Sequence, residues 1–426
     1  AVGAWRVCLL PNRLPRAYPV ATPDPEMLML ASIPARALAL STALALSLAL
    51  AGPAVAAPCG GDFGAFIGAM KAEAQARGLS AAEADAFFAS ARQDPRVIKA
   101  DRSQGVFRKT FTEFSRSLIS QGRISKGAAN ARKYAAIFDR AEREFGVPKG
   151  ILLAFWAFET DYGAVQGDFN TLNALVTLGH DCRRPELFQP QILAAAQLWQ
   201  RGMLDPAKTT GAWAGEIGMV QMLPADILER GVDGDGDGRV TLKTSVPDAL
   251  LSGARMLQYH GWRAGEPWLI EVDMPAEFDW GLTGLDTRLT GAEWKRLGVT
   301  PRWGAIPNGL AASVLLPEGR RGVAFLAFDN YRTLFEWNKS FVYVTTAAYF
   351  AARLEGAPVY DAGTPERGLT GEQMQALQQK LAARGHDVGG IDGILGALTR
   401  TAVQKEQARL GLPADAWPTR ALLDAL

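Results

Sequence analysis

Apolar residues recur with helical spacing over most of residues 62–355. They stand three and four positions apart, for example at Phe63, Phe66 and Ile67, a pattern that predicts helices with one buried face. Within residues 281–321 the periodicity weakens and Gly, Pro and Thr accumulate, which predicts a small irregular or β insertion. We therefore expect a mainly α fold for this part of the chain.

The most continuously apolar stretch lies near the N-terminus. Residues 37–52 read ALALSTALALSLALAG, which is shorter than the roughly 20 residues that a membrane-spanning helix needs. Small residues that suit a signal-peptidase cleavage site follow it. We expect residues 1–57 to be a signal peptide, with translation starting at Met27 or Met29.

The rest of the chain divides into a long unit, a linker and a short unit. Residues 356–368 read GAPVYDAGTPERG, a Pro- and Gly-rich composition that predicts a linker. The expected units are residues 58–355 and residues 369–426, and the second is small but large enough for an independent domain.

Charge and metal-binding residue types narrow the classes of function. The 426 residues include 45 Lys and Arg against 44 Asp and Glu, a formal net charge of +1. Because no global field attracts nucleic acid, a neutral or mixed-charge partner is expected. Three cysteines and three scattered histidines exclude a thiolate metal cluster and an H-E-x-x-H zinc site.

The first candidate for chemistry is a buried helix within residues 146–163, GVPKGILLAFWAFETDYG. Pro148 suits its first turn and Gly163 its C-cap. Residues 151–158 are apolar on all sides, so Glu159 stands at the end of a buried helix. Burial and the helix dipole both favour a protonated carboxyl group there, as a general acid requires. The alternative is a Glu that reaches solvent or pairs with an arginine.

The second candidate is a glycine-rich turn. Residues 215–226 read GEIGMVQMLPAD, with glycines before Gln221 and a proline after it. Such a turn brings the glutamine amide and nearby backbone close to a ligand. Neutral donors and acceptors of this kind suit a sugar.

The third candidate is an acidic loop at residues 232–242, VDGDGDGRVTL. Its aspartates occupy positions 1, 3 and 5 of an EF-hand calcium loop, but position 12 is Thr244 rather than Glu. The predicted calcium ligands are Asp233, Asp235, Asp237, Arg239 through its carbonyl, and Asp248 as the nearest further carboxylate. The alternative is a solvated acidic turn.

Taken in order, these motifs resemble a known family. VPKGILLAFWAFETDYG is followed by TLNALVTL, CRRPELF, GEIGMVQMLP, DGDGDGRVTL and WNKSFVY, which is similar to the catalytic domain of the lytic murein transglycosylase B family. The resemblance implies a lysozyme-like fold with a cleft and an EF-hand-like calcium loop. It also implies cleavage of the β-1,4 bond between N-acetylmuramic acid and N-acetylglucosamine in peptidoglycan, with formation of 1,6-anhydromuramic acid ends.

The resemblance assigns roles to single residues. Glu159 matches the catalytic acid/base. The residues implied to bind or line the substrate site are Gln221, Arg183, Arg184, Asn338 and Tyr343. The two arginines suit either peptide carboxylates or the anchoring of the cleft wall. The chain departs from the family at Asp161 and Tyr162, where an Arg-Trp pair is more usual.

The C-terminal unit resembles a second family. Residues 369–426 contain an LQ run that ends at Gly385, then Asp392-Gly393 and Gly411-Leu412-Pro413, as in the small three-helix peptidoglycan-binding domain. A wall-binding unit raises the local concentration of a catalytic domain on an insoluble polymer.

Two other functions stay open. A lysozyme-type muramidase needs a second carboxylate about 5 to 9.5 Å from the first, and Glu216 is the candidate. A non-catalytic, calcium-stabilised wall-binding protein would bind peptidoglycan without cleaving it. The lone Glu159 favours the transglycosylase, in which the sugar's own C6 hydroxyl replaces water.

If the signal peptide directs export of the chain, it also determines what to expect of the cysteines, the location and the partners. Removal of the signal peptide also removes Cys8, and Cys59 and Cys182 are expected to form one disulfide. Pro58 directly before Cys59 is a poor fit to a lipidation motif. The mature chain is expected to act without a transmembrane anchor in the periplasm of a Gram-negative bacterium, with structural Ca²⁺. Its expected partners are peptidoglycan and other cell-wall enzymes.

Overall fold

A computed structural model of the chain describes residues 58–103 and 109–426. The predicted signal peptide, with Met27, Met29 and Cys8, lies outside the described residues. The described part is mainly α, as expected from the apolar spacing. No helix in it is both long enough and apolar enough to span a membrane.

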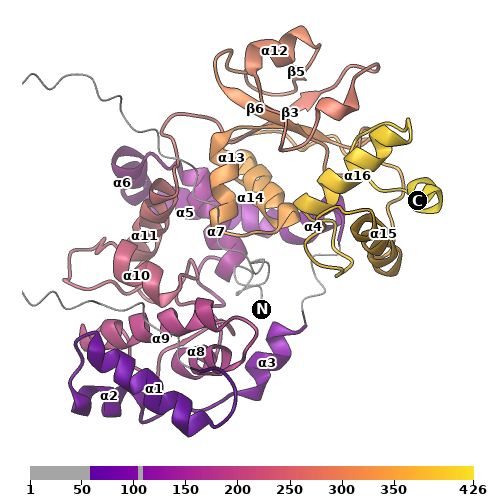
Figure 1. Cartoon of the computed structure of the whole chain (residues 1–426). Coiled ribbons are helices and arrows are strands. Elements are labelled where there is room, and N and C mark those ends of the chain that lie inside the picture. Colours follow the sequence, from indigo (N-terminus) through magenta and orange to yellow (C-terminus); the bar gives the residue numbers. More distant parts are fainter. Residues whose placement is uncertain (1–57, 104–108) are drawn as a thin grey trace, which may run out of the picture.

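The helices follow one another in short segments joined by loops (Figure 1). The first half of the chain contains α1 (Phe63–Ala76), α2 (Ala81–Phe88), α3 (Pro95–Asp101), α4 (Phe111–Leu118), α5 (Gln121–Lys133), α6 (Ala135–Phe145), α7 (Lys149–Thr160), α8 (Thr171–His180) and α9 (Pro185–Gln200). The second half contains α10 (Pro224–Arg230), α11 (Val246–Tyr259), α12 (Gly291–Arg296), α13 (Asp329–Thr333), α14 (Phe341–Leu354), α15 (Gly371–Ala383), α16 (Ala397–Arg409) and α17 (Arg420–Ala425). Two 3-10 turns are η2 (Trp280–Leu282) and η3 (Leu334–Glu336).

Helices α1, α2, α8 and α9 form a lobe at one end of the molecule (Figure 1). A disulfide joins Cys59, which precedes α1, to Cys182, which follows α8, and the two Cα atoms lie 5.1 Å apart. The adjacent Gly60 amide donates to the His180 carbonyl at 2.8 Å. The chain entering the lobe is therefore fixed to the loop that carries Arg183 and Arg184.

Helix α7 is buried from Gly150 to its end, as its apolar sequence predicts. Its ends differ slightly from the prediction. Pro148 is the N-cap residue, and Asp161 is the C-cap residue with φ of 50°. Gly163, the expected C-cap, also has a positive φ but lies two residues further on. The left-handed turn therefore begins on an aspartate, a residue type that tolerates this conformation better than most.

The predicted insertion is a regular antiparallel sheet. Its strands extend beyond residues 281–321 on both sides, from Leu269 to Ala327. Its strand order is β4-β6-β7-β3-β5. One face packs on the helical core through Leu315 and Phe325, and α12 lies at the outer end of the sheet (Figure 1). The strands are β3 (Leu269–Asp273), β4 (Leu289–Thr290), β5 (Thr300–Pro301), β6 (Ala311–Leu315) and β7 (Ala324–Ala327). Every residue of β7 is buried, so the sequence lacks the polar alternation that identifies a half-exposed strand. A separate two-stranded pair joins β1 (Phe169–Asn170) to β2 (Thr210–Gly211).

The C-terminal helices α15, α16 and α17 enclose a small apolar core of their own. The preceding Pro- and Gly-rich segment has no helix or strand, but it is held in place. Tyr360 is buried and its hydroxyl lies 2.9 Å from Ser115 Oγ, while the Thr364 amide donates to the Arg321 carbonyl at 2.8 Å. The segment predicted as a linker therefore packs on the larger unit.

Candidate active site

Glu159 lies in the last turn of α7 with only 1% of its surface exposed. Its Oε1 accepts hydrogen bonds from Trp337 Nε1 at 3.0 Å and from the Tyr343 hydroxyl at 2.5 Å. Both donors are neutral groups, and both donate to the same carboxyl oxygen. The carbonyl-type oxygen of a protonated carboxyl group is its better acceptor, so a protonated Glu159 is expected to carry its hydrogen on Oε2.

Aromatic stacking fixes the two donors. The Trp337 ring stacks on Phe155 of α7, with ring centroids 4.3 Å apart and planes 18° apart. One turn further along α7, Phe158 stacks on Phe350 of α14 at 5.1 Å. Such pairs stabilise beyond the area they bury. Trp337 is a site residue that the sequence analysis missed, although it opens the WNKSFVY motif from which Asn338 and Tyr343 were chosen.

The predicted glycine-rich turn lies against the end of α7. The Thr160 hydroxyl donates to the Met219 carbonyl at 2.6 Å, which brings Gln221 into the neighbourhood of Glu159. Gln221 has a φ of 52°, a left-handed conformation that costs about 1–3 kcal/mol for such a residue and is frequent at functional sites. Its Nε2 donates to the Gly218 and Gln166 carbonyls at 2.8 and 3.2 Å.

Two buried amides keep one polar atom each without a partner in residues 58–103 and 109–426. These atoms are Gln221 Oε1 and Asn338 Nδ2, and both side chains are only 1% exposed. Asn338 Oδ1 is used locally, since it accepts from the Ser340 amide at 2.8 Å. Buried polar atoms are almost always paired. One unpaired acceptor and one unpaired donor match an amide-bearing ligand.

The predicted arginine pair is directed at a carboxylate of the protein. Arg183 Nη1 lies 2.5 Å from Asp101 Oδ2, and Arg184 pairs with the other oxygen of Asp101. Asp101 and Arg184 are buried, whereas 46% of the Arg183 side chain is exposed. This geometry supports the anchoring role for Arg184, because it ties α3 to the start of α9. Arg183 is the member of the pair that a ligand can reach.

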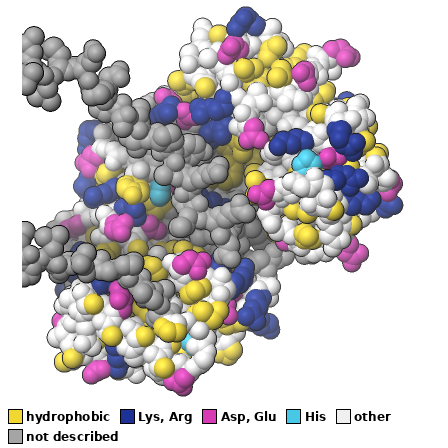
Figure 2. Space-filling view, in the orientation of Figure 1, with side chains coloured by type: hydrophobic (Ala, Val, Ile, Leu, Met, Phe, Trp, Pro, Cys, Tyr) yellow, Lys and Arg dark blue, Asp and Glu magenta, His cyan; other side chains and the backbone are white. Residues whose placement is uncertain are grey.

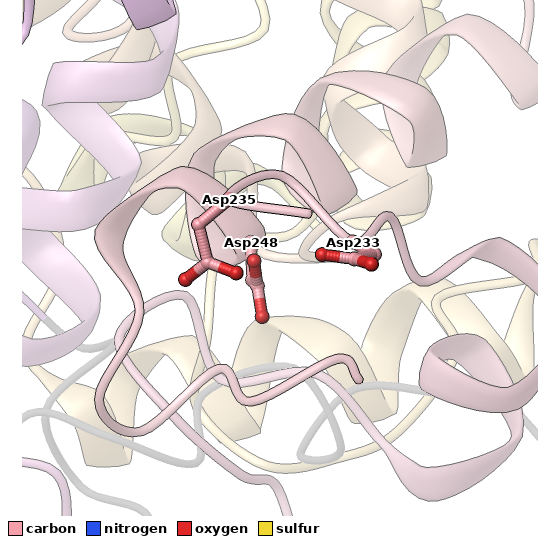
Figure 3. A group of neighbouring side chains, drawn as sticks. All are labelled: Asp233, Asp235 and Asp248. Carbon is pink, nitrogen blue, oxygen red and sulfur yellow. The ribbon is translucent and has the colours of Figure 1, made fainter. Parts of the chain in front are cut away.

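The acidic loop brings three of its predicted ligands together. Carboxylate oxygens of Asp233, Asp235 and Asp248 lie within 4.8 Å of one another (Figure 3). Asp248 is fully buried at the start of α11 and accepts from the Gly234 and Thr241 amides at 2.9 and 2.6 Å. It therefore closes the loop from a position that a standard EF-hand does not use.

The other two predicted ligands stand outside that group. Asp237 is exposed, and its Oδ1 accepts from the Arg239 amide at 2.9 Å. Within the group, Asp233 accepts hydrogen bonds from three backbone amides, those of Gly236, Asp237 and Gly238. The described residues thus form a carboxylate cluster of the hard oxygen type that calcium prefers.

Two further carboxyl groups bear on the role of Glu159: Asp161, two residues after it, and Glu216, the candidate second carboxylate. Their surroundings differ. Asp161 lies 2.8 Å from Lys126 Nζ and 3.2 Å from Arg123 Nε. The hydrogen bond from Lys126, followed by that from Arg123, holds the pKa of Asp161 below its usual range. Glu216 is fully buried within the Gln221 turn. Asp161 is therefore engaged by two cations and is not placed to activate water.

Comparison with known families decides the classification. Residues 62–352 match the Transglycosylase SLT domain family. The chain belongs to this family. Residues 370–426 match a peptidoglycan binding domain family, so both folded units of the transglycosylase chain have a recognised relative.

Individual relatives agree with this classification. SltB3 from Pseudomonas aeruginosa in complex with NAG-anhNAM-pentapeptide is 37% identical, with a TM-score of 0.79 over 86% of this chain and 99% of that chain. SltB1 from Pseudomonas aeruginosa is 25% identical, with a TM-score of 0.60 over 68% and 99%. The membrane-bound lytic murein transglycosylase B of Escherichia coli is 27% identical over 230 residues, which are 53% of this chain and 62% of that relative. This chain therefore spans less than two thirds of the E. coli protein.

On the face shown in Figure 2, acidic and basic side chains are intermingled, and neither sign of charge dominates the described surface of this transglycosylase-family chain. This agrees with the near-zero net charge. Without a field of one sign, selectivity for a ligand has to come from local groups.

Replacing Asp161 by Asn tests how much the negative charge at the C-cap of α7 stabilises the fold. Asn tolerates the left-handed conformation as well as Asp does, so the substitution removes the charge and keeps the backbone. Because the pKa of folded Asp161 is lowered, the carboxylate stabilises the fold above its unfolded-state pKa, and this contribution is lost as pH falls. We expect Asp161→Asn to lower the unfolding free energy at pH 7 by about 1 kcal/mol, the scale of a partly exposed ion pair.

Urea unfolding of both proteins at pH 7 and at about pH 3, below the usual aspartate range, provides the measurement. The difference between them should be smaller at the lower pH, because this stabilisation is lost as pH falls toward and through the lowered pKa of folded Asp161. An equal difference at both pH values would show that the charge of Asp161 is not its cause.

Proposed function

We propose that the chain is a lytic transglycosylase that cleaves the β-1,4 bond between N-acetylmuramic acid and N-acetylglucosamine and leaves 1,6-anhydromuramic acid ends. The observation that carries this proposal is the buried carboxyl group of Glu159, which two neutral donors orient. The neighbouring Asp161 is held by Arg123 and Lys126. The complexes of the relative SltB3 with NAG-anhNAM-pentapeptide and NAG-NAM-pentapeptide support the substrate class.

In the proposed reaction Glu159 acts twice. Its Oε2 first gives a proton to the glycosidic oxygen, so that N-acetylglucosamine leaves as a neutral alcohol. The N-acetyl oxygen of muramic acid assists at the anomeric carbon. The Glu159 carboxylate then removes the proton from the C6 hydroxyl, whose oxygen attacks the anomeric carbon and closes the anhydro ring. One carboxyl group is sufficient because no water has to be activated.

The buried amides supply recognition of the substrate's N-acetyl groups. An acetamido group offers one N–H donor and one carbonyl acceptor. Gln221 Oε1 and Asn338 Nδ2 are an acceptor and a donor without partners among the described residues. Binding an N-acetyl sugar would remove the cost of leaving such atoms unpaired, which is about 1–3 kcal/mol for each.

The domain organisation extends the proposal. We assign residues 58–355 to the catalytic domain, residues 356–368 to the connection and residues 369–426 to peptidoglycan binding, in line with the two family matches. We place the enzyme in the periplasm, where the Cys59–Cys182 disulfide is stable. The apolar segment at residues 37–52 would direct it there.

Replacing Glu159 by Gln tests the assignment directly. Gln keeps the size of the side chain but provides neither the acid nor the base, a role worth about 10²- to 10⁴-fold in rate for each proton transfer. We expect release of anhydro-muropeptides from purified sacculi to become undetectable by mass spectrometry, while the melting temperature stays close to that of the wild type.

Glu216→Gln is the companion variant, because it separates the lytic reaction from the muramidase alternative. The transglycosylase releases anhydro ends whether or not position 216 carries a charge. A muramidase releases products heavier by one water and requires Glu216 as its second carboxylate. Hydrated reducing ends in the wild-type digest that disappear in Glu216→Gln would overturn the proposal.

Tyr343→Phe tests the orientation of Glu159. The ring remains and only the hydroxyl that donates to Oε1 is lost. A hydrogen bond to a charged group contributes about 1.5–3 kcal/mol, which corresponds to a fall in kcat of about 10- to 100-fold with little change in KM. The carboxylate form loses a donor, so the pH–rate profile should also move to higher pH.

Tyr360→Phe is the matched control for Tyr343→Phe. Tyr360 is also buried, but its hydroxyl bonds to Ser115. We expect this variant to keep the wild-type kcat and pH profile. Equal losses in the two variants would show a general effect of removing a buried hydroxyl.

We also propose that Asp233, Asp235 and Asp248 hold a structural Ca²⁺. The clustering of three carboxylates, one of them fully buried, supports this, since like charges at such spacing repel one another without a cation. Slt35 from Escherichia coli, which shares the fold at 24% identity with a TM-score of 0.60 over 70% of this chain and 96% of that chain, has a structure in complex with calcium. The ion would join the loop to the start of α11.

Chelation provides the test of this ion. A ligand that binds only the folded chain stabilises it by about 2.7 kcal/mol when its free concentration is a hundred times Kd. We expect EDTA to lower the melting temperature by several degrees and added Ca²⁺ to restore it. Asp248→Asn should abolish this dependence, whereas Asp387→Asn, in an exposed loop of the C-terminal unit, should retain it. A melting temperature that EDTA does not change would contradict the proposal.

A further inference from the structure

A cavity of about 270 Å³ lies where α16 meets the sheet and α14. Its walls include Leu315, Phe341 and Leu398, which are apolar, and Arg332 and Arg400, which are cationic. Pockets for drug-sized ligands measure about 300–1,000 Å³. This cavity is therefore suited to the end of a chain molecule rather than to a disaccharide.

Arg400 is a partly buried cation in the wall of this cavity. Its guanidinium donates to the Leu316 and Pro317 carbonyls at 3.2 and 2.5 Å and lies 4.4 Å from the Phe341 ring centroid. Burial lowers its pKa to about 10. No described carboxylate lies within ion-pair distance of it. Carbonyls and a ring face stabilise the charge without neutralising it, so the wall stays electropositive.

Arg332 brings a second guanidinium to the same cavity. It donates to the Leu285 carbonyl at 2.5 Å and to Ser313 Oγ at 2.8 Å. Its side chain is only partly buried, and within the described chain it too has no ion pair with a carboxylate. Two guanidinium groups that border one small cavity favour an anion there, and the planar guanidinium group matches a carboxylate as well as a phosphate.

The two acids that line the cavity do not cancel this preference. Asp415 accepts from Gln407, from the Trp417 amide and from the Arg320 amide, so both of its oxygens are engaged. Asp286 is exposed and accepts from the Thr401 hydroxyl at 3.1 Å. Its free face suits an amino group on the same ligand. The lining therefore fits a carboxylate inside, apolar side chains along the wall and an amine at the solvent side.

We propose that this cavity binds the free carboxyl end of a peptide stem of peptidoglycan. The proposal rests on the proposed function, which makes a peptide-bearing glycan the substrate. A stem joined to the glycan through its amino end presents a C-terminal carboxylate, and capture of such termini is an established mode of peptide recognition. Phe341 in the cavity wall and Tyr343 at Glu159 belong to the same turn of α14. These residues are two positions apart, so their side chains leave the helix about 200° apart, and the cavity would hold the stem of a strand on the other side of this turn from the catalytic carboxyl group.

A synthetic pentapeptide with a free carboxyl end, and the same peptide as its C-terminal amide, are the probes. Calorimetric titration uses the full chain carrying Glu159→Gln. The acid should bind at least about 10-fold more tightly than the amide, the scale of one charge-assisted hydrogen bond. Equal affinity for the two peptides, or no binding of either, would overturn the proposal.

Two Leu→Trp variants in the same background locate the binding. Leu398→Trp fills the cavity from α16 and should weaken binding of the acid by about 10-fold, the effect of losing one good contact. Leu297→Trp is the matched control, because Leu297 is similarly exposed, at 39% against 44%, and lies outside the cavity. Equal effects of the two variants would place the peptide elsewhere.

A separate assay distinguishes this proposal from the catalytic one. The chain with its native Glu159 is incubated with glycan strands from which an amidase has removed the stems. Release of anhydro ends from these strands tests the lytic activity without any stem. If that reaction proceeds and the acid and amide peptides bind equally, the cavity proposal alone is wrong. If no strand with or without stems is cleaved, the proposed function is wrong.

Discussion

The close packing of α7 against α14 is the constraint on which the site depends. Gly150 permits it, because a Cβ atom there would lie 2.7 Å from the Ala351 carbonyl oxygen. Along the same contact Phe158 stacks on Phe350. Glu159 is on one helix and Tyr343 is on the other, so their 2.5 Å hydrogen bond exists only if the helices approach this closely. Orientation of the acid is thus a consequence of tertiary packing.

Local patterns were sufficient to predict α7, Glu159 at its end and the acidic loop, because each of these features is determined by residues that are adjacent in the sequence. They were insufficient for contacts between distant segments. Trp337 has no distinctive local signal, and its role appears only when its ring stacks on Phe155. Asp101 was not singled out either, yet it determines where Arg183 and Arg184 point. The choice of Asp248 was a guess from sequence proximity, and the fold supplies its physical reason, which is the start of α11 lying across the loop.

The sheet shows a different limit of sequence reasoning. Strand β7 is buried on both faces, and four of the five residues of β6 are buried as well. A strand covered on both sides reads as a short apolar run, which periodicity does not distinguish from a buried helix. The sequence therefore indicated only an irregular or small β insertion. Its limits were too narrow because β7 (AFLA) has no polar alternation and β3 (LIEVD) alternates over only four residues. The loop that follows β6 then provides the carbonyls that accept from Arg400.

That last contact changes how the C-terminal unit acts. A flexible tether would contribute only a higher local concentration of the catalytic domain on its polymer. Here the connection is held at Tyr360 and Thr364, and Arg400 donates hydrogen bonds to two carbonyls of the larger unit. Two binding surfaces held together by these contacts would favour a strand that matches their separation and direction. The loss of tether freedom removes ordering entropy that binding would otherwise cost, and it makes the geometry between the units a determinant of which strands reach Glu159.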